Sequence, residues 1–202
     1  LRIGASTTIA TYLLPPLLGR FAARHPGADV RLTSANTRDI VRRLQGYELD
    51  VALVEGPVAG EGIAVTPWRE DVLVLIAPPR HPLAGRSVAW TRVARERLLV
   101  REPGSGTAEV VAAALAARGL RAGRTVELGS TEAIKQAVAA GLGLAFVSRE
   151  AAADQFALGT VALVTVRGLS IRRMLARIAL AGRRPSAMAR AFDEVAGELG
   201  SA

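Results

Sequence analysis

The spacing of apolar residues at the start of the chain switches from the pattern of a strand to that of a helix. Residues Leu1–Ala5 form a short apolar run that predicts a strand. Ile9, Leu13, Leu17 and Phe21 then recur every four residues, which is typical of the buried face of a helix. The chain therefore begins with a predicted strand and helix.

Prolines and glycines divide the segments that follow. Pro15-Pro16 must kink or restart the first helix, because neither residue can donate the hydrogen bond of a helix interior. After a turn at His25-Pro26-Gly27, the pattern predicts a strand through Val30, Leu32 and Ser34, a helix over Thr37–Tyr47 and a buried parallel strand over Leu49–Val54. This alternating order predicts a parallel sheet with right-handed crossovers.

A second alternating set follows the first. Ile63–Val65 and Val72–Ala77 predict two further strands, and Pro78-Pro79 interrupts the chain. The later segments predict strands over Leu98–Arg101, Thr125–Leu128, Leu144–Val147 and Val161–Val166, and helices over Thr107–Arg118, Thr131–Ala140 and Glu150–Ala157. The chain is therefore expected to hold two similar α/β units.

The last segment predicts how the two units are joined. Arg172–Ala181 has the pattern of a long strand, and Pro185 opens a helix with Met188, Phe192, Val195 and Leu199 on one face. We expect this helix to return to the first unit. The predicted fold is α/β with mainly parallel sheets, in two lobes joined by two strands that cross near residues 76–78 and 176–179. Lobe I covers residues 1–77 and 178–202, and lobe II covers residues 78–177.

Composition narrows the class of protein. Half of the 202 residues are apolar and 22% are charged, which is typical of an ordered globular protein. No apolar run reaches the roughly 18 to 20 residues that cross a bilayer. The net charge of +8 suggests nucleic-acid binding, but the basic residues are scattered arginines, with Lys135 the only lysine. We therefore expect a solvated basic surface that does not itself recognise DNA.

Signals for catalysis are weak. The chain has no cysteine, which excludes disulfides, thiolate metal sites and a cysteine nucleophile. His25 and His81 each precede a proline and are expected in turns. The motifs of zinc proteases, serine hydrolases, P-loops and dinucleotide-binding folds are missing. Asp50 and Glu55 flank a strand without forming an evident acid–base pair. We predict no catalytic residue, no metal and no cofactor.

Small hydroxyl residues follow strands at three predicted helix starts: Ser6-Thr7-Thr8, Ser105-Gly106-Thr107 and Ser130-Thr131. The free N–H groups and the dipole at such a position attract an anion, to which hydroxyl groups can also donate. The alternative is simple N-capping, for which Ser and Thr are favoured. Because open α/β sheets bind ligands at the carboxyl ends of their strands, three such sites favour a ligand-binding role.

The segment Arg101–Thr107 adds a second kind of candidate. Gly104 and Gly106 allow the backbone to approach a ligand closely, and the guanidinium of Arg101 can bind a carboxylate, phosphate or sulfur oxyanion with two hydrogen bonds. The alternative is a tight turn in which Arg101 pairs with Glu102. The residues alone leave both readings open.

Several stretches together resemble the regulatory domain of LysR-type transcriptional regulators. Together these stretches span nearly the whole chain, in the order and spacing of the family. Residues 1–6, 13–21 and 25–26 resemble its first strand and helix, and residues 49–56 resemble its third strand. Residues 78–83 resemble its passage into the second lobe, and residues 101–107 and 134–143 resemble its later motifs.

The resemblance implies a type II periplasmic-binding-protein-like fold in the cytoplasm, with a small-molecule effector between the lobes. It also implies a homodimer, side by side and antiparallel, within a tetrameric full-length protein. The N-terminal DNA-binding winged helix-turn-helix of the family is absent from this chain. Carried over by position, the expected effector-binding residues are Ser6, Thr8, Ser34, Asn36, Arg101 and Thr131. Thr7, Ser105, Thr107 and Ser130 join them from the helix-start pattern.

The expected function is effector sensing by a LysR-type regulator, which would control DNA binding of the full-length protein. The hydroxyls, helix starts and Arg101 suggest an anionic metabolite, and the scarcity of aromatic residues argues against a large aromatic ligand. The alternative is a periplasmic-type solute-binding protein of a transporter, and an enzyme is the third candidate. An upstream helix-turn-helix would favour the regulator, and an upstream export signal would favour transport.

Overall fold

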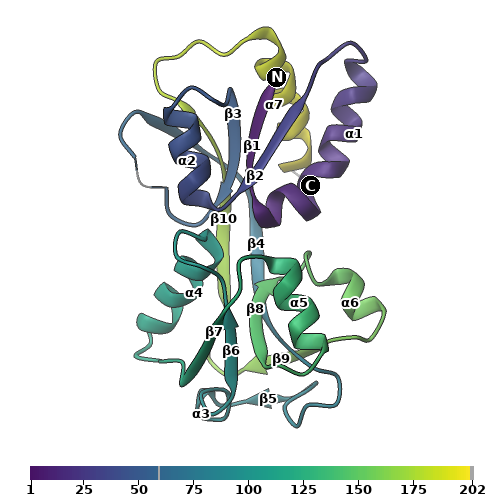
Figure 1. Ribbon diagram of the computed structural model, residues 1–202, viewed down its shortest axis with the longest axis vertical. Coiled ribbons are helices and arrows are strands. Elements are labelled where there is room, and N and C mark those ends of the chain that lie inside the picture. The colour runs from purple at the N-terminus through teal and green to yellow at the C-terminus, as the bar shows by residue number, and fades with distance from the viewer. Residues whose placement is uncertain (59, 201–202) are drawn as a thin grey trace. The chain divides into compact units, whose positions relative to one another are not determined.

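The computed structural model in Figure 1 describes residues 1–58 and 60–200, with side chains described as far as Glu198. The chain divides into two compact units, and each is described here by itself. Unit 1 contains Leu1–Glu70, Gly104–Gly106 and the chain from Met174 onward, and unit 2 contains Asp71–Pro103 and Thr107–Arg173. The strands β4 (Ile63–Ala77) and β10 (Ile171–Leu180) each contribute residues to both units.

Unit 1 is built around a sheet with the strand order β2-β1-β3-β10-β4. Strands β1 (Arg2–Ser6), β2 (Arg31–Ala35) and β3 (Val51–Glu55) are parallel, and β10 is antiparallel to β3. The helical elements are η1 (Ile9–Leu13), α1 (Leu14–Arg24), α2 (Thr37–Gln45) and α7 (Ala187–Gly200). The parallel order predicted from the alternating pattern is confirmed.

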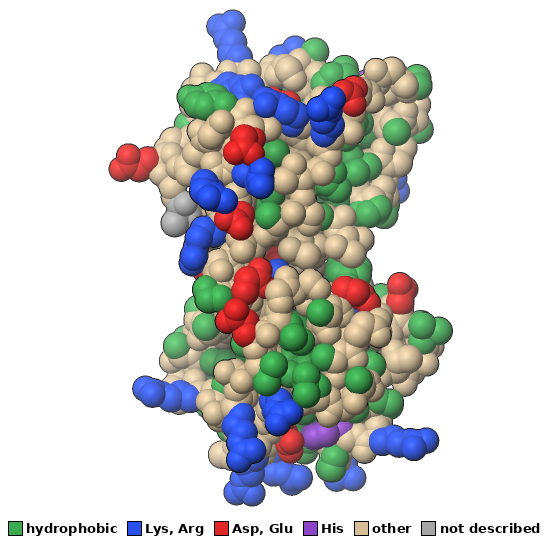
Figure 2. Space-filling view, in the orientation of Figure 1, with side chains coloured by type: hydrophobic (Ala, Val, Ile, Leu, Met, Phe, Trp, Pro, Cys, Tyr) green, Lys and Arg blue, Asp and Glu red, His purple; other side chains and the backbone are tan. Residues whose placement is uncertain are grey.

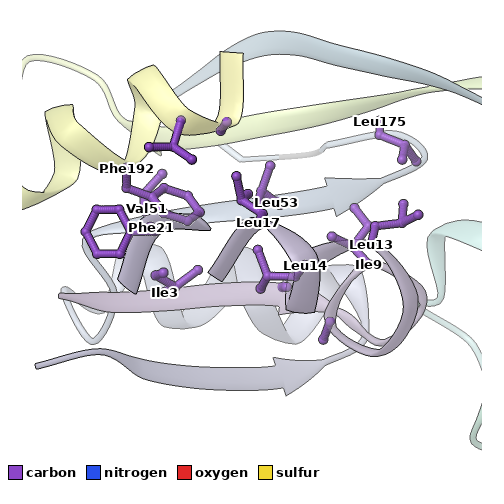
Figure 3. Packing of buried hydrophobic residues seen from close by; sticks show 14 residues of the cluster. Ile3, Ile9, Leu13, Leu14, Leu17, Phe21, Val51, Leu53, Leu175 and Phe192 are labelled. Carbon is purple, nitrogen blue, oxygen red and sulfur yellow. The ribbon is translucent and has the colours of Figure 1, made fainter. Parts of the chain in front are cut away.

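Apolar residues cover both faces of this sheet. On one face, Ile3, Val51 and Leu53 pack with α1 and α7, as Figure 3 shows for Phe21 and Phe192. The rings of these two residues meet edge to face, with centroids 5.8 Å apart. On the other face, Ile40, Val41 and Leu44 of α2 pack against Leu49, Ala52 and Val54. Because alternate residues of β3 face opposite sides of the sheet and both sides are covered, its sequence is apolar from Val51 to Val54.

The first helix shows the effect of its prolines. A π-helical turn, η1, ends at Leu13, and α1 then begins with Pro15 and Pro16 in its first turn. The first turn tolerates proline because its N–H groups have no partner within the helix. The predicted restart is confirmed, and it adds a π turn that the spacing did not predict.

Unit 2 is also an α/β unit, with strands in the order β4-β8-β6-β7 and with β9 paired to β4 and β5. Its strands are β5 (Ser87–Val88), β6 (Arg97–Val100), β7 (Arg124–Glu127), β8 (Leu144–Ser148) and β9 (Ala162–Val166). Its helices are α3 (Trp90–Val93), α4 (Gly106–Ala116), α5 (Thr131–Ala139) and α6 (Ala153–Ala157). Strand β6 is parallel to β7 and β8, whereas β4 is antiparallel to β8 and β9.

Three expectations need correction. The two strands predicted over Ile63–Val65 and Val72–Ala77 form one continuous strand, β4, because the charged residues between them stay extended. The short elements β5 and α3 were not predicted. Within β4 and β10 the units divide after Glu70 and Arg173, not near residues 77 and 177 as expected, and Gly104–Gly106 groups with unit 1.

The last helix returns to unit 1, as predicted. Trp68 donates its indole N–H to the carbonyl of Ala196 over 2.9 Å, and Arg24 pairs with Glu198. The side chain of Leu199, which the pattern placed on the apolar face, lies outside the described residues. Among the helices described, none is long and apolar enough to cross a membrane.

Candidate effector-binding residues

Ser6 and Thr8 lie at the carboxyl end of β1, where the chain turns into η1. Both side chains are buried, each 1% exposed. The Ser6 hydroxyl has no hydrogen-bond partner among the described residues. Thr8 makes no side-chain cap, so N-capping does not explain its hydroxyl. Thr7, between them, donates to the carbonyl of Ala35 over 3.3 Å. Of the three hydroxyls, those of Thr7 and Thr8 donate to named partners, whereas the buried hydroxyl of Ser6 has none among the described residues.

Glu55 is a site residue that the sequence did not single out. It ends β3, and its carboxylate is 1% exposed. Thr8 donates its hydroxyl to Glu55 Oε1 over 3.1 Å, and Thr37 donates to the Glu55 carbonyl over 2.9 Å. The register pairs Ala5 with Leu53, so the ends of β1 and β3 share one edge of the sheet. This parallel pairing was the signal that could have brought Glu55 and Thr8 together.

The two candidates at the second strand, Ser34 and Asn36, lie in different surroundings. Ser34 lies on the outer strand β2 and is exposed. Asn36 caps α2, because its side chain accepts a hydrogen bond from the Asp39 N–H over 3.0 Å. The side-chain oxygen of Asn36 therefore acts as the N-cap of α2.

The segment Gly104–Gly106 lies against the end of β3 in unit 1. The Gly104 carbonyl accepts a hydrogen bond from the Arg38 N–H over 3.2 Å. A Cβ atom on Gly106 would lie 1.7 Å from the Glu55 carbonyl oxygen. Any residue other than glycine would therefore clash with the backbone at this position. Ser105, 1% exposed, lies between these glycines. Glycine at position 106 thus permits a close approach to the backbone of Glu55, and the expected approach of this segment to a ligand stays a prediction.

In unit 2, Arg101 is held by its neighbours. It is buried and donates through Nε and Nη2 to the carboxylate of Glu102, over 2.8 and 2.9 Å. Its Nη1 donates to the hydroxyl of Thr131 over 3.0 Å. The pairing of Arg101 with Glu102 that one alternative expected is present, and contact of Arg101 with a ligand stays a prediction. Ser130 caps α5 by accepting from the Ala133 N–H.

Thr107 belongs to a buried ionic network. Arg173 donates to Thr107 Oγ1 over 2.8 Å and to Asp71 over 2.7 Å, while Ser148 donates to the same carboxylate. The side chains of Arg173 and Asp71 are 2% and 3% exposed. An ion pair this deeply buried needs such added hydrogen bonds to offset its desolvation. The Thr107 hydroxyl therefore serves as an acceptor within unit 2.

Within the described residues, no group of three or more His, Cys, Asp or Glu side chains could hold a metal ion. Figure 2 shows basic side chains dispersed over the face that it presents, in agreement with the scattered arginines of the sequence. On this face, the view therefore shows no single concentrated basic patch.

These features, two α/β units with buried hydroxyls at the carboxyl ends of parallel strands, define a ligand-binding α/β protein. The family model described as the LysR substrate binding domain matches residues 1–200. The chain therefore belongs to that family.

The chain is also similar to individual proteins with different names. The chain is 36% identical over 178 residues to the uncharacterized HTH-type transcriptional regulator YeiE of Escherichia coli, covering 88% of this chain and 61% of that protein. It is 38% identical over 199 residues to a phosphonates import ATP-binding protein, PhnC, of Anaeromyxobacter dehalogenans, covering 97% of this chain and 40% of that protein. The chain spans about three fifths of the length of the regulators that it matches.

Solved structures agree on the fold. The regulatory domain of CcmR from Synechocystis, in complex with 2-PG, superimposes with a TM-score of 0.91 at 32% identity, covering 99% of this chain and 96% of that one. The effector-binding domain of QuiR in complex with shikimate has a TM-score of 0.87 at 18% identity, covering 100% and 96%, and shares the fold. The predicted fold class is confirmed.

Proposed function

We propose that this chain is the effector-sensing domain of a cytoplasmic LysR-type transcriptional regulator and that its effector is a small anion. Family membership supports the first part. DNA binding would belong to a helix-turn-helix elsewhere in the full-length protein, and the domain itself would form a homodimer without enzymatic activity. The anion is supported by the buried hydroxyl of Ser6 at a helix start.

The site-forming group in unit 1 consists of Ser6 and the amides that open η1. These amides have no partner within the helix and carry the positive end of its dipole. Thr8 lies beside them, but its hydroxyl hydrogen points to Glu55. A hydroxyl has one donor and two lone pairs, so Thr8 can offer a ligand only an acceptor. We therefore assign donation to Ser6 and a positioning role to Thr8.

In unit 2, Thr131 and Arg101 form a second candidate group. Thr131 accepts a hydrogen bond from Arg101, and the pairing of Arg101 with Glu102 fixes the position of that guanidinium. We propose that Thr131 also donates to the effector. Ser34, Ser105 and Thr107 remain weaker candidates, and Asn36 and Ser130 are caps whose removal serves as a control.

The nature of the anion is suggested by two relatives. The CcmR domain was solved with 2-PG, and the PhnC relative is named for phosphonate import. We therefore expect an anion of that kind, with oxygen atoms that accept hydrogen bonds. The transport alternative, a solute-binding protein, gains no support, since the relative named for transport is an ATP-binding protein.

Calorimetry on the whole 202-residue chain tests the site. Ser6→Ala and Thr131→Ala are titrated with 2-PG, inorganic phosphate and sulfate beside the parent, and each loss of a hydrogen bond to a charged ligand should weaken binding about ten- to a hundredfold. The control Asn36→Ala should lower stability by about 1 kcal/mol and leave affinity unchanged. If both hydroxyl variants bind as the parent does, the assigned site is wrong.

A further inference from the structure

A pocket lies within unit 2, and it shares no residue with the candidate effector-binding groups. Its volume is about 190 Å³, and strands β4, β8 and β9 line it with the segment that leads into β10. An apolar cavity of roughly 150 Å³ is large enough to hold benzene. The pocket can therefore hold a compact molecule with about one ring or a short chain.

The course of β9 creates this pocket. Strand β9 pairs with β4 from Ala77 to Leu75, where Leu75 stands opposite Val164. The paired register ends there, and the next two residues, Thr165 and Val166, pair with β5 instead. The residues of β4 before Leu75, beginning at Val72, line the space that follows. These strands appear with their labels in the lower part of Figure 1.

The inner wall of the pocket is apolar. Leu73, Leu75, Phe146, Val164 and Ile171 line it, and all five belong to one buried hydrophobic cluster. A ligand against this wall gains by removing apolar surface from water, which is the usual source of affinity in small-molecule pockets. The wall selects a ligand with an apolar body.

The polar lining residues are of a different kind. They are Arg149, Thr165 and Ser170, and all three are exposed to solvent. The Arg149 backbone is fixed by a 2.9 Å hydrogen bond from its N–H to the Val72 carbonyl. Within the described residues, no hydrogen bond or ion pair engages its guanidinium. An unpaired cation beside two hydroxyls and an apolar wall is complementary to a carboxylate on an apolar body.

We propose that this pocket binds a small aromatic or short-chain aliphatic monocarboxylate, as a second ligand site independent of the effector site. The apolar body lies on the Leu73–Phe146 wall, and the carboxylate accepts hydrogen bonds from Arg149. The pocket suits a molecule of about six to nine non-hydrogen atoms, because its volume slightly exceeds that of the benzene cavity.

Amide NMR on the 202-residue chain tests this proposal, with benzoate and hexanoate as probes and benzyl alcohol as the uncharged comparison. We expect benzoate to shift the amides of Leu73, Val164 and Ile171 with a dissociation constant of about 1 mM or tighter. Arg149→Gln should weaken benzoate at least about threefold and leave benzyl alcohol unchanged. Ser170→Phe, at an exposed position, should fill the mouth and reduce binding of all three probes.

Two control variants separate this site from other causes. Arg80→Gln removes an exposed arginine of unit 2 that does not line the pocket and should change nothing. Ser6→Ala should leave benzoate binding intact, which distinguishes this pocket from the effector site. The proposal is overturned if benzoate up to about 20 mM, well above that dissociation constant, shifts none of these amides. It is also overturned if Arg149→Gln and Arg80→Gln weaken binding equally.

Discussion

Thr8 donates its hydroxyl hydrogen to the buried carboxylate of Glu55, across 47 positions of sequence and 3.1 Å of space. Glu55 therefore accepts the hydroxyl hydrogen of Thr8, which is why we propose Ser6 and not Thr8 as the donor to an anion. This hydrogen bond also ties the start of η1 to the end of β3. The same hydroxyl that the sequence suggested as a ligand contact thus acts by holding a neighbour.

The two hydroxyls should therefore respond differently to removal. Thr8→Val keeps the shape of the side chain but takes one donor from a buried carboxylate, so it should lower the free energy of unfolding by about 1 to 3 kcal/mol. Ser6→Ala removes a hydroxyl that has no partner among the described residues, and its cost should stay within about 0.5 kcal/mol. Urea denaturation measures both. Equal losses of stability would contradict the assignment.

Gly106 should be intolerant of any side chain. Its Cβ position meets the Glu55 carbonyl oxygen at 1.7 Å, and that oxygen belongs to a backbone already bonded to Thr37. We expect Gly106→Ala to destabilise the protein by about 3 kcal/mol or more, since the strand end or the helix start must move. Gly19→Ala, in α1 with nothing within 4 Å, should instead stabilise by about 0.5 to 1 kcal/mol. Thermal melting of the two variants provides the comparison.

The salt bridge of Asp50 should make stability depend on pH. The hydrogen bonds from Arg2 lower the pKa of Asp50 from 3.8 to about 2, with Arg183 adding to the effect. Because the folded-state pKa is the lower one, the contribution is present above pH 4 and is lost as the pH falls through 2.

Asp50→Asn should therefore cost about 1 kcal/mol at pH 7, a value reduced for solvent screening of this half-exposed pair. The difference between the variant and the parent should shrink as the pH falls below 4, where the parent carboxylate in the unfolded chain is already protonated. Urea denaturation at a series of pH values tests this. A constant difference down to pH 2 would show that the charge of Asp50 is not its source.

The buried pair of Asp71 and Arg173 should be costly to break from one side. Asp71→Ala leaves the guanidinium of Arg173 in a site where its side chain is only 2% exposed, so we expect a loss of about 3 to 5 kcal/mol. The double variant Asp71→Leu with Arg173→Met removes both charges and should recover part of that loss. If the double variant is less stable than Asp71→Ala, the ion pair contributes more to stability than the neutralisation of two buried charges.

Dimerisation is tested through α1. In the proposed homodimer we expect residues 16–24 of one chain to lie against residues 135–142 of a partner copy, and Ala22 is exposed on α1. Ala22→Glu should therefore shift the mass measured by light scattering from dimer to monomer, because it introduces a charge into an apolar contact. Arg80→Glu, at an exposed position of unit 2, should leave the dimer intact. A monomeric parent at high concentration would refute the proposed assembly.

The apolar spacing of the sequence was sufficient to predict most strands and helices, the parallel order of β1, β2 and β3, and the return of α7 to unit 1. These features depend on periodicities that are local to each segment and on proline and glycine positions. The long β4 was missed because Arg69, Glu70 and Asp71 interrupt its apolar pattern, while pairing with neighbouring strands keeps the chain extended.

The sequence by itself determined where hydroxyl groups follow strands, and it marked Ser6, Thr8, Asn36, Ser130 and Thr131 as equivalent candidates. Only the tertiary structure showed which of these side chains are buried, because burial depends on the elements that pack around a residue. It alone joined Glu55 to Thr8 and Gly106, and Arg101 to Thr131. Such partners lie tens of residues apart and meet only when strands pair, so no local spacing in the sequence can encode their contact.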